Sequence, residues 1–204
     1  MPVVTRDATL ESLVSPEDEL RANVYRLLAR WLVAAPSQSD LAAAKAMSGD
    51  ETDFGKAVQT FSHVSARIEP KEVQQEYQDL FIGVGRGELL PYASYYLAGF
   101  LNEKPLAKLR NDMARLGIER DPKTKDPEDH IAALMEMQAG LIMGDYGKPA
   151  SLTEQKQFFE IHVGSWAKLF FADLEGAKQS VLYASLATIG RLFMEIEETA
   201  FLMS

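Results

Sequence analysis

Helical periodicity runs through almost the whole chain and limits the fold more than any other feature of the sequence. Apolar residues recur at three- and four-residue intervals, and no segment shows a convincing strand alternation. The clearest helix start is Ser15-Pro16-Glu17-Asp18, where a capping serine precedes a proline and two acids that suit the positive end of the helix dipole. The pattern predicts an all-α protein, a single bundle of roughly eight to ten helices.

Proline, glycine and capping residues mark the ends of these predicted helices. The segment 158–173 is apolar on most sides, so we expect it to be central. Helices are predicted from 15 to Pro36, over 40–47, 54–68, from Pro70 to Gly83, over 105–116 and 126–143, from Ser151 onward, and along a final stripe of Leu182, Leu186, Ile189, Phe193 and Ile196.

The segment from Gly117 to Pro127 is polar and carries two prolines, which is typical of a hinge. We therefore predict one domain over residues 1–204, with an N-terminal lobe over 15–116, a hinge over 117–127 and a C-terminal lobe over 128–204.

Charge and composition restrict the partners. The net charge of −9 disfavours nucleic acid and anionic lipid and favours a basic partner, although solubility explains the value equally well. The first 14 residues show neither a signal-peptide pattern nor a twin arginine, and no apolar run approaches the roughly 20 residues of a membrane span. We expect a cytoplasmic protein without stable membrane insertion.

Catalytic and metal-binding patterns are missing from the sequence. The chain has no cysteine, and its histidines, His63, His130 and His162, do not stand in the spacings of common zinc sites. No Gly-x-Ser-x-Gly motif occurs. We expect a protein that is not an enzyme and needs no cofactor. His162 is expected to be buried and hydrogen-bonded to the backbone.

Two aromatic clusters flank a glycine-rich loop. In the first, Leu80 and Phe81 are predicted to lie in the core, whereas the tyrosines need partners for their hydroxyl groups. A groove lined by tyrosines would suit an amphipathic helix with a basic end. The residues concerned are Tyr77, Leu80, Phe81 and Gly83, followed by Pro91, Tyr92, Ser94 and Tyr96.

The segment Asp126-Pro127-Glu128-Asp129-His130 predicts a helix capped by Asp126, with Asp129 at its third position and His130 at its fourth. Asp129 and Glu136 would then share one stripe, a shallow acidic surface for an arginine-bearing peptide. A capped helix with a solvated acidic face is the alternative interpretation.

The loop Gly83–Gly87 leaves a second function open. Its glycines are spaced as in some phosphate-binding loops, but no Lys-Ser/Thr follows. A nucleotide-binding helical switch or enzyme therefore remains an alternative hypothesis, as does a plain helical scaffold.

Four motifs in order carry a family resemblance. They are Tyr77-x-x-Leu80-Phe81-x-Gly83, Pro91-x-x-Ser94-x-Tyr96, Asp126-Pro127-x-Asp129-His130-Ile131 and Phe158-Phe159-x-x-His162-x-x-x-Trp166. From about Leu20 to Glu197, the chain resembles the TorD/DmsD/NarJ family of cytoplasmic chaperones that mature molybdenum-containing redox enzymes. Asp126 and Tyr92 stand where many members have glutamate and tryptophan, which bears on the partner more than on the function.

The resemblance implies a chaperone that binds the twin-arginine signal peptide and the apo catalytic subunit of a molybdopterin-containing oxidoreductase. It would assist cofactor insertion and delay export, as a monomer or a domain-swapped dimer. The peptide-binding residues that we expect are Asp129, His130, Glu136, Tyr77, Leu80, Phe81, Gly83, Pro91, Tyr92, Ser94 and Tyr96.

Overall fold

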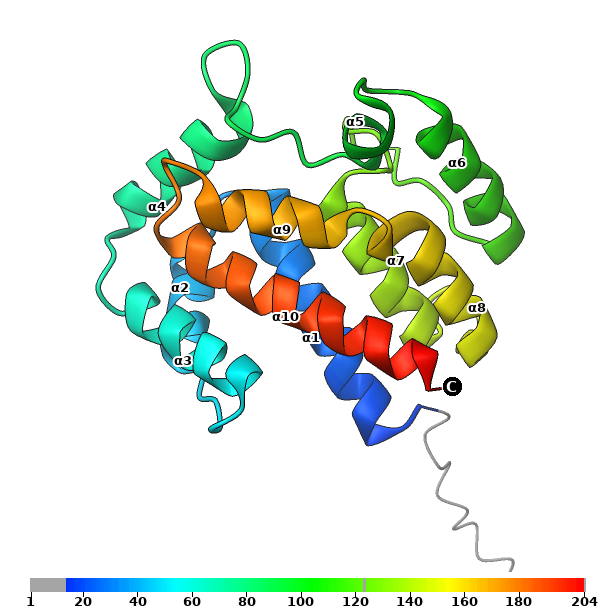
Figure 1. The fold of residues 1–204 in the computed structure, drawn as a ribbon, viewed down its shortest axis with the longest axis horizontal. Helices are drawn as coiled ribbons and strands as arrows, with labels where there is room; N and C mark the ends of the chain where they lie inside the picture. Colours follow the sequence, from blue (N-terminus) through cyan, green and yellow to red (C-terminus); the bar gives the residue numbers. More distant parts are fainter. Residues whose placement is uncertain (1–13, 123, 204) are drawn as a thin grey trace, which may run out of the picture.

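The computed structural model describes residues 14–122 and 124–203, and within these ranges the chain is helical without a β-strand (Figure 1). The predicted all-α class is confirmed. No helix of the described residues is both long and apolar enough to cross a bilayer. Most of the N-terminal stretch in which we sought an export signal lies outside the described residues.

Most predicted helices are present, with local differences. An additional short helix, α5, follows Tyr92, and the apolar segment 158–173 is divided by a break at Ser165 and Trp166. The elements are α1 Pro16–Val33, α2 Gln38–Lys45, α3 Asp53–Ser65, α4 Pro70–Tyr77, the π-helical turn η1 Gln78–Ile82, α5 Ala93–Ala98, α6 Lys104–Leu116, α7 Ile131–Met143, α8 Leu152–Phe158, the π-helical turn η2 Phe159–Gly164, α9 Ala167–Gly176 and α10 Leu182–Leu202.

Two long helices organise the core. α1 packs along α7, and α10 packs against α9 and α3, while α5 and α6 lie at the opposite end of the molecule from α2 and α3 (Figure 1). Trp31 of α1 makes edge contacts with Phe61 and Tyr183. Helices from both predicted lobes therefore contribute to the same core, and the division at residues 117–127 stays a prediction.

Glu76 on α4 caps the start of α10. Its buried carboxylate accepts hydrogen bonds from the backbone amides of Val181, Leu182 and Tyr183, at 2.7, 3.1 and 2.8 Å. These amides lack acceptors within their own helix, so a side chain distant in sequence satisfies them. The contact fixes α4 against α10.

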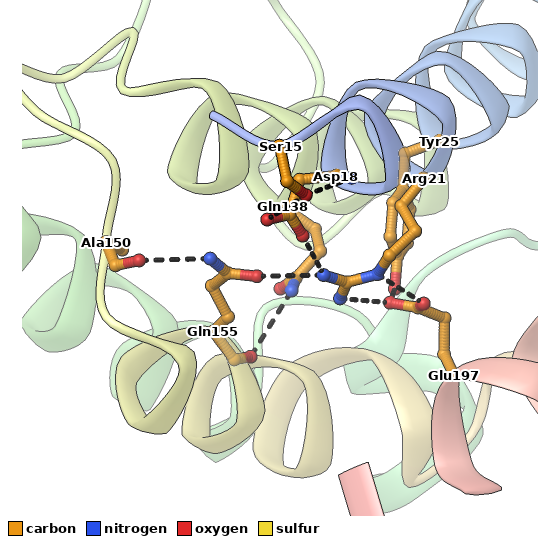
Figure 2. A network of polar contacts seen from close by, with 8 residues as sticks. All are labelled: Ser15, Asp18, Arg21, Tyr25, Gln138, Ala150, Gln155 and Glu197. Carbon is orange, nitrogen blue, oxygen red and sulfur yellow. Dashed lines mark hydrogen bonds and ion pairs between the residues drawn. The ribbon is translucent and has the colours of Figure 1, made fainter. Parts of the chain in front are cut away.

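A partly buried ion pair joins α1 to α10 (Figure 2). The Arg21 guanidinium donates two hydrogen bonds of 2.8 Å to Glu197, which also accepts one of 2.9 Å from the Tyr25 hydroxyl. Arg21 also donates to Asp18 and Gln155, at 2.6 and 3.3 Å. The network ties three helices together, α1, α8 and α10.

His162 on η2 is buried as predicted, but its partner differs from the prediction. The ring nitrogen Nε2 lies 2.8 Å from Asp112 Oδ2 on α6, rather than against the backbone. Asp112 is 50 residues away in sequence, so spacing alone gave no sign of the pair. Burial lowers the pKa of His162, and the hydrogen bond to Asp112 opposes that effect.

Candidate functional site

Two of the sequence motifs meet through their backbones. Tyr92 and His130 form an isolated antiparallel β-bridge. The Ala93 amide donates to the Asp129 carbonyl at 3.0 Å, and the Ile131 amide donates to the Pro91 carbonyl at 2.8 Å. The Ser94 amide adds a 2.8 Å hydrogen bond to Asp129 Oδ2. The bridge therefore holds Pro91–Ser94 against Asp129–Ile131.

The bridge overturns the predicted start of α7. The helix begins at Ile131 and its N-cap is His130, whose Nδ1 accepts a hydrogen bond of 3.1 Å from the Ala132 amide. Asp129 precedes the helix and is only 1% exposed, so it does not share an exposed acidic stripe with Glu136. The physical reason is that the Asp129 carbonyl is paired with Ala93, whereas an α-helix would pair it with an amide four residues later.

His130 is uncharged at neutral pH. Burial lowers its pKa to about 4, against the opposing effects of Asp126 and Asp129. A cap that accepts through Nδ1 also requires that nitrogen to be unprotonated. The Tyr92 ring packs edge-on against the imidazole, 5.0 Å between centroids, and its hydroxyl donates to Asp126 Oδ1 at 3.1 Å. Burial, then the Asp126 charge, raises the pKa of Tyr92.

His130 opens into a pocket of about 430 Å³ between α1, α7 and the segment that precedes α7. We call it the α1–α7 pocket. The apolar residues that line it include Val33, Met113, Ile118, Ala133 and Met137.

Charges on the wall of the α1–α7 pocket are unbalanced. Its arginines have acidic partners: Arg26 pairs with Asp145, Arg30 with Asp40, and Arg120 with Glu128. Glu119 and Glu136 line the same pocket, and neither forms an ion pair with another described residue. Together with Asp126, they leave an excess of negative charge beside an apolar surface.

The residues of the first aromatic motif do not line this pocket. Leu80 is fully buried, as predicted, and Tyr77 is nearly so. Phe81 packs edge-on against Tyr183, with 5.4 Å between centroids. Gly83, at φ 61°, ends η1, and an added Cβ would lie 2.0 Å from the Arg86 carbonyl oxygen. Close packing thus accounts for the glycine without a bound phosphate.

The remaining predicted residues support the bridge or neighbouring helices. Pro91 and Ser94 are buried behind the bridge. The Tyr96 hydroxyl donates to Asp173 Oδ2 at 3.0 Å, and its ring contacts Trp166. Of the predicted set, His130 and Glu136 line the α1–α7 pocket, and Tyr92 contacts its edge through Asp126.

Sequence reasoning missed Ile118 and Glu119, which lie in the segment interpreted as a hinge, although both line the α1–α7 pocket. An isolated apolar residue in a polar segment gives no periodic signal. Within residues 14–122 and 124–203, no group of three His, Cys, Asp or Glu side chains is arranged to hold a metal ion.

Comparison with known proteins adds a family-level match. A family model described as the nitrate reductase delta subunit matches residues 48–172, more than half of the chain. The chaperone protein TorD of Vibrio cholerae serotype O1 (strain ATCC 39541) is 26% identical over 198 residues, covering 87% of this chain and 90% of its own. TorD of Vibrio parahaemolyticus is 25% identical over 140 residues, covering 65% of each chain.

One solved structure resembles the fold. It is a crystal structure described as that of a redox enzyme maturation protein from Archaeoglobus fulgidus, with a TM-score of 0.52 and 18% identity. The match covers 93% of this chain and 99% of the other. At that identity, the likeness bears on the fold alone.

Proposed function

Because this chain belongs to the nitrate reductase delta subunit family, we propose that it is a chaperone for the maturation of a molybdopterin-containing oxidoreductase. In this proposal it acts in the cytoplasm and binds the twin-arginine signal peptide of the apo catalytic subunit. Binding would delay export until the cofactor has been inserted. The role requires recognition rather than turnover, so we expect no enzymatic activity.

The α1–α7 pocket is the observation that supports binding of a twin-arginine signal peptide. A twin-arginine signal combines a basic start with an apolar middle, and its receptor needs acids beside an apolar surface. Glu119 and Glu136 carry charges without partners among the described residues, and Met113, Ile118 and Met137 supply the apolar surface. Methionine side chains adapt to different apolar ligands because they are flexible and polarisable.

The predicted residues divide into three roles in this proposal. Glu136 and His130 contact the peptide, with Glu119 added by the structure. Tyr92, Pro91, Ser94 and Asp129 position His130 through the β-bridge. Tyr77, Leu80, Phe81, Gly83 and Tyr96 stabilise the helices that carry the site.

Calorimetric titration with twin-arginine signal peptides from molybdoenzymes tests the proposal, with Arg-Arg→Ala-Ala peptides as controls. Replacing Glu119 and Glu136 together by glutamine removes two exposed charges that line the pocket, so we expect affinity to fall by about fivefold to thirtyfold. The matched control, Glu17→Gln with Glu51→Gln, removes the same charge at exposed positions away from the pocket. Equal affinities in both double variants would remove the α1–α7 pocket from the proposal.

A further inference from the structure

A second pocket lies on the other side of the bridge. It has a volume of about 470 Å³ and is enclosed by α5, α6, η2 and the start of α7. We call it the α5–α6 pocket. Asp129 lines this pocket, whereas its neighbour His130 lines the α1–α7 pocket. Adjacent residues of one motif therefore serve two different cavities.

The Asp129 carboxylate is only half satisfied. Oδ2 accepts from the Ser94 amide at 2.8 Å, but Oδ1 is buried without a hydrogen-bond partner among the described residues. The residue is 1% exposed. Buried polar atoms are nearly always paired, and a carboxylate oxygen without a donor is costly. An N–H or O–H group in the α5–α6 pocket would supply the missing donor.

Two lysines line the entrance of the α5–α6 pocket, in a protein of net charge −9, and one exposed acid, Glu160, lines it from η2. Lys104 and Lys108 line it from α6, four residues apart and therefore on one face of the helix. Both are exposed, and neither forms an ion pair with another described residue. The wall between the lysines and Asp129 is mainly apolar, with Leu97, Pro105 and Ile161.

We propose that the α5–α6 pocket binds a peptide segment that carries an acidic group next to a large apolar side chain. The acidic group pairs with Lys104 and Lys108, the apolar side chain covers the wall, and an N–H of the segment donates to Asp129 Oδ1. This ligand is opposite in charge to the basic peptide proposed for the α1–α7 pocket. The two sites therefore select different segments.

N-acetyl-L-tryptophan is a small probe that combines all three properties, a carboxylate, an aromatic body and N–H donors. We would titrate it into the ¹⁵N-labelled protein and follow amide shifts. Saturable shifts confined to α5, α6 and η2 are expected. N-acetyl-L-tryptophan amide lacks the negative charge, so it should bind about threefold to tenfold more weakly.

Two protein variants test the roles of the residues. Lys104→Gln with Lys108→Gln changes only exposed side chains. It should weaken the binding of N-acetyl-L-tryptophan by about threefold to tenfold and leave the binding of the uncharged amide unchanged. Asp129→Asn keeps an acceptor for Ser94 and should weaken both probes by about tenfold, because its amide nitrogen cannot accept a hydrogen bond. A melting curve checks that the Asp129→Asn variant folds. If it does not fold, the lysine variant and the comparison of the two probes still test the proposal.

Several results would overturn the proposal. They are no saturable binding at millimolar probe, equal affinity of the acid for the wild type and the lysine variant, or shifts centred on the α1–α7 pocket. Glu119→Gln with Glu136→Gln separates this proposal from the chaperone proposal, because it should weaken a basic peptide and leave the probe unaffected.

Discussion

Replacement of Glu197 by glutamine removes the charge from the partly buried pair in Figure 2 while preserving the side-chain volume. Glu197 is fully buried and accepts two hydrogen bonds from Arg21 and one from Tyr25. Glutamine has one acceptor oxygen in place of two, so at least one of these donors loses its partner. The variant should therefore be substantially less stable than the wild type.

The structure sets the size of the effect. Removing one partner of a buried ion pair costs about 3–5 kcal/mol, because the other charge is left uncompensated. Arg21 keeps its contacts with Asp18 and Gln155, and its side chain is 20% exposed. These features place the cost near the lower limit, at about 3 kcal/mol. For a chain of this size, Tm should fall by about 6–12 °C.

Urea unfolding followed by circular dichroism measures the change in the free energy of unfolding. The double variant Arg21→Met with Glu197→Met should cost less than Glu197→Gln, since it leaves neither charge without its partner. A loss below about 1 kcal/mol for Glu197→Gln would refute the argument. So would a double variant at least as unstable as the single one.

Three further changes test other parts of the fold by the same unfolding assay. His130→Asn keeps a side chain that can cap the helix but that does not titrate. Because the pKa of His130 is lowered to about 4, the free energy of unfolding of the wild type should fall by about 2 kcal/mol more than that of the variant between pH 7 and pH 5. Parallel plots of stability against pH for the two proteins would contradict this. Glu76→Ala removes the acceptor for three amides at the start of α10 and should cost about 2–4 kcal/mol, against no measurable change for the exposed Glu51→Ala. Gly190→Ala would place its Cβ 2.4 Å from the Phe171 ring and should cost about 1–3 kcal/mol, whereas an unchanged stability would mean that the ring moves freely.

The helices could be predicted because their signals are local. Ser15 caps α1 and accepts from the Asp18 amide, as its spacing indicates, and Ser151 begins α8 with a complete capping box. Burial on one face of each helix also repeats at the helical period, so core positions such as Leu80 and Leu186 can be recognised from the sequence.

The site could be predicted only in part because its geometry is non-local. Asp126-Pro127 has the local signature of a helix start, yet the Asp129 carbonyl is paired with Ala93, 36 residues earlier. A single pairing across that distance has no periodicity, so local patterns place the helix start too early. Glu119 could not be predicted for a related reason. The segment before α7 lines a pocket only because α1 packs against α7, and that packing is not visible in a local pattern.

The corrected backbone explains how one motif contributes to two pockets. In an extended segment, successive side chains point to opposite faces, whereas in a helix they project from one convex surface. His130 is extended, with φ −63° and ψ 138°, and forms the bridge to Tyr92. It lines the α1–α7 pocket, and Asp129 before it lines the α5–α6 pocket. A helix that began at Asp126 would have placed Asp129 on the same stripe as Glu136, and the two acids would have formed one site. The β-bridge instead places the side chains of the adjacent residues Asp129 and His130 in different pockets, so the motif contributes one residue to each.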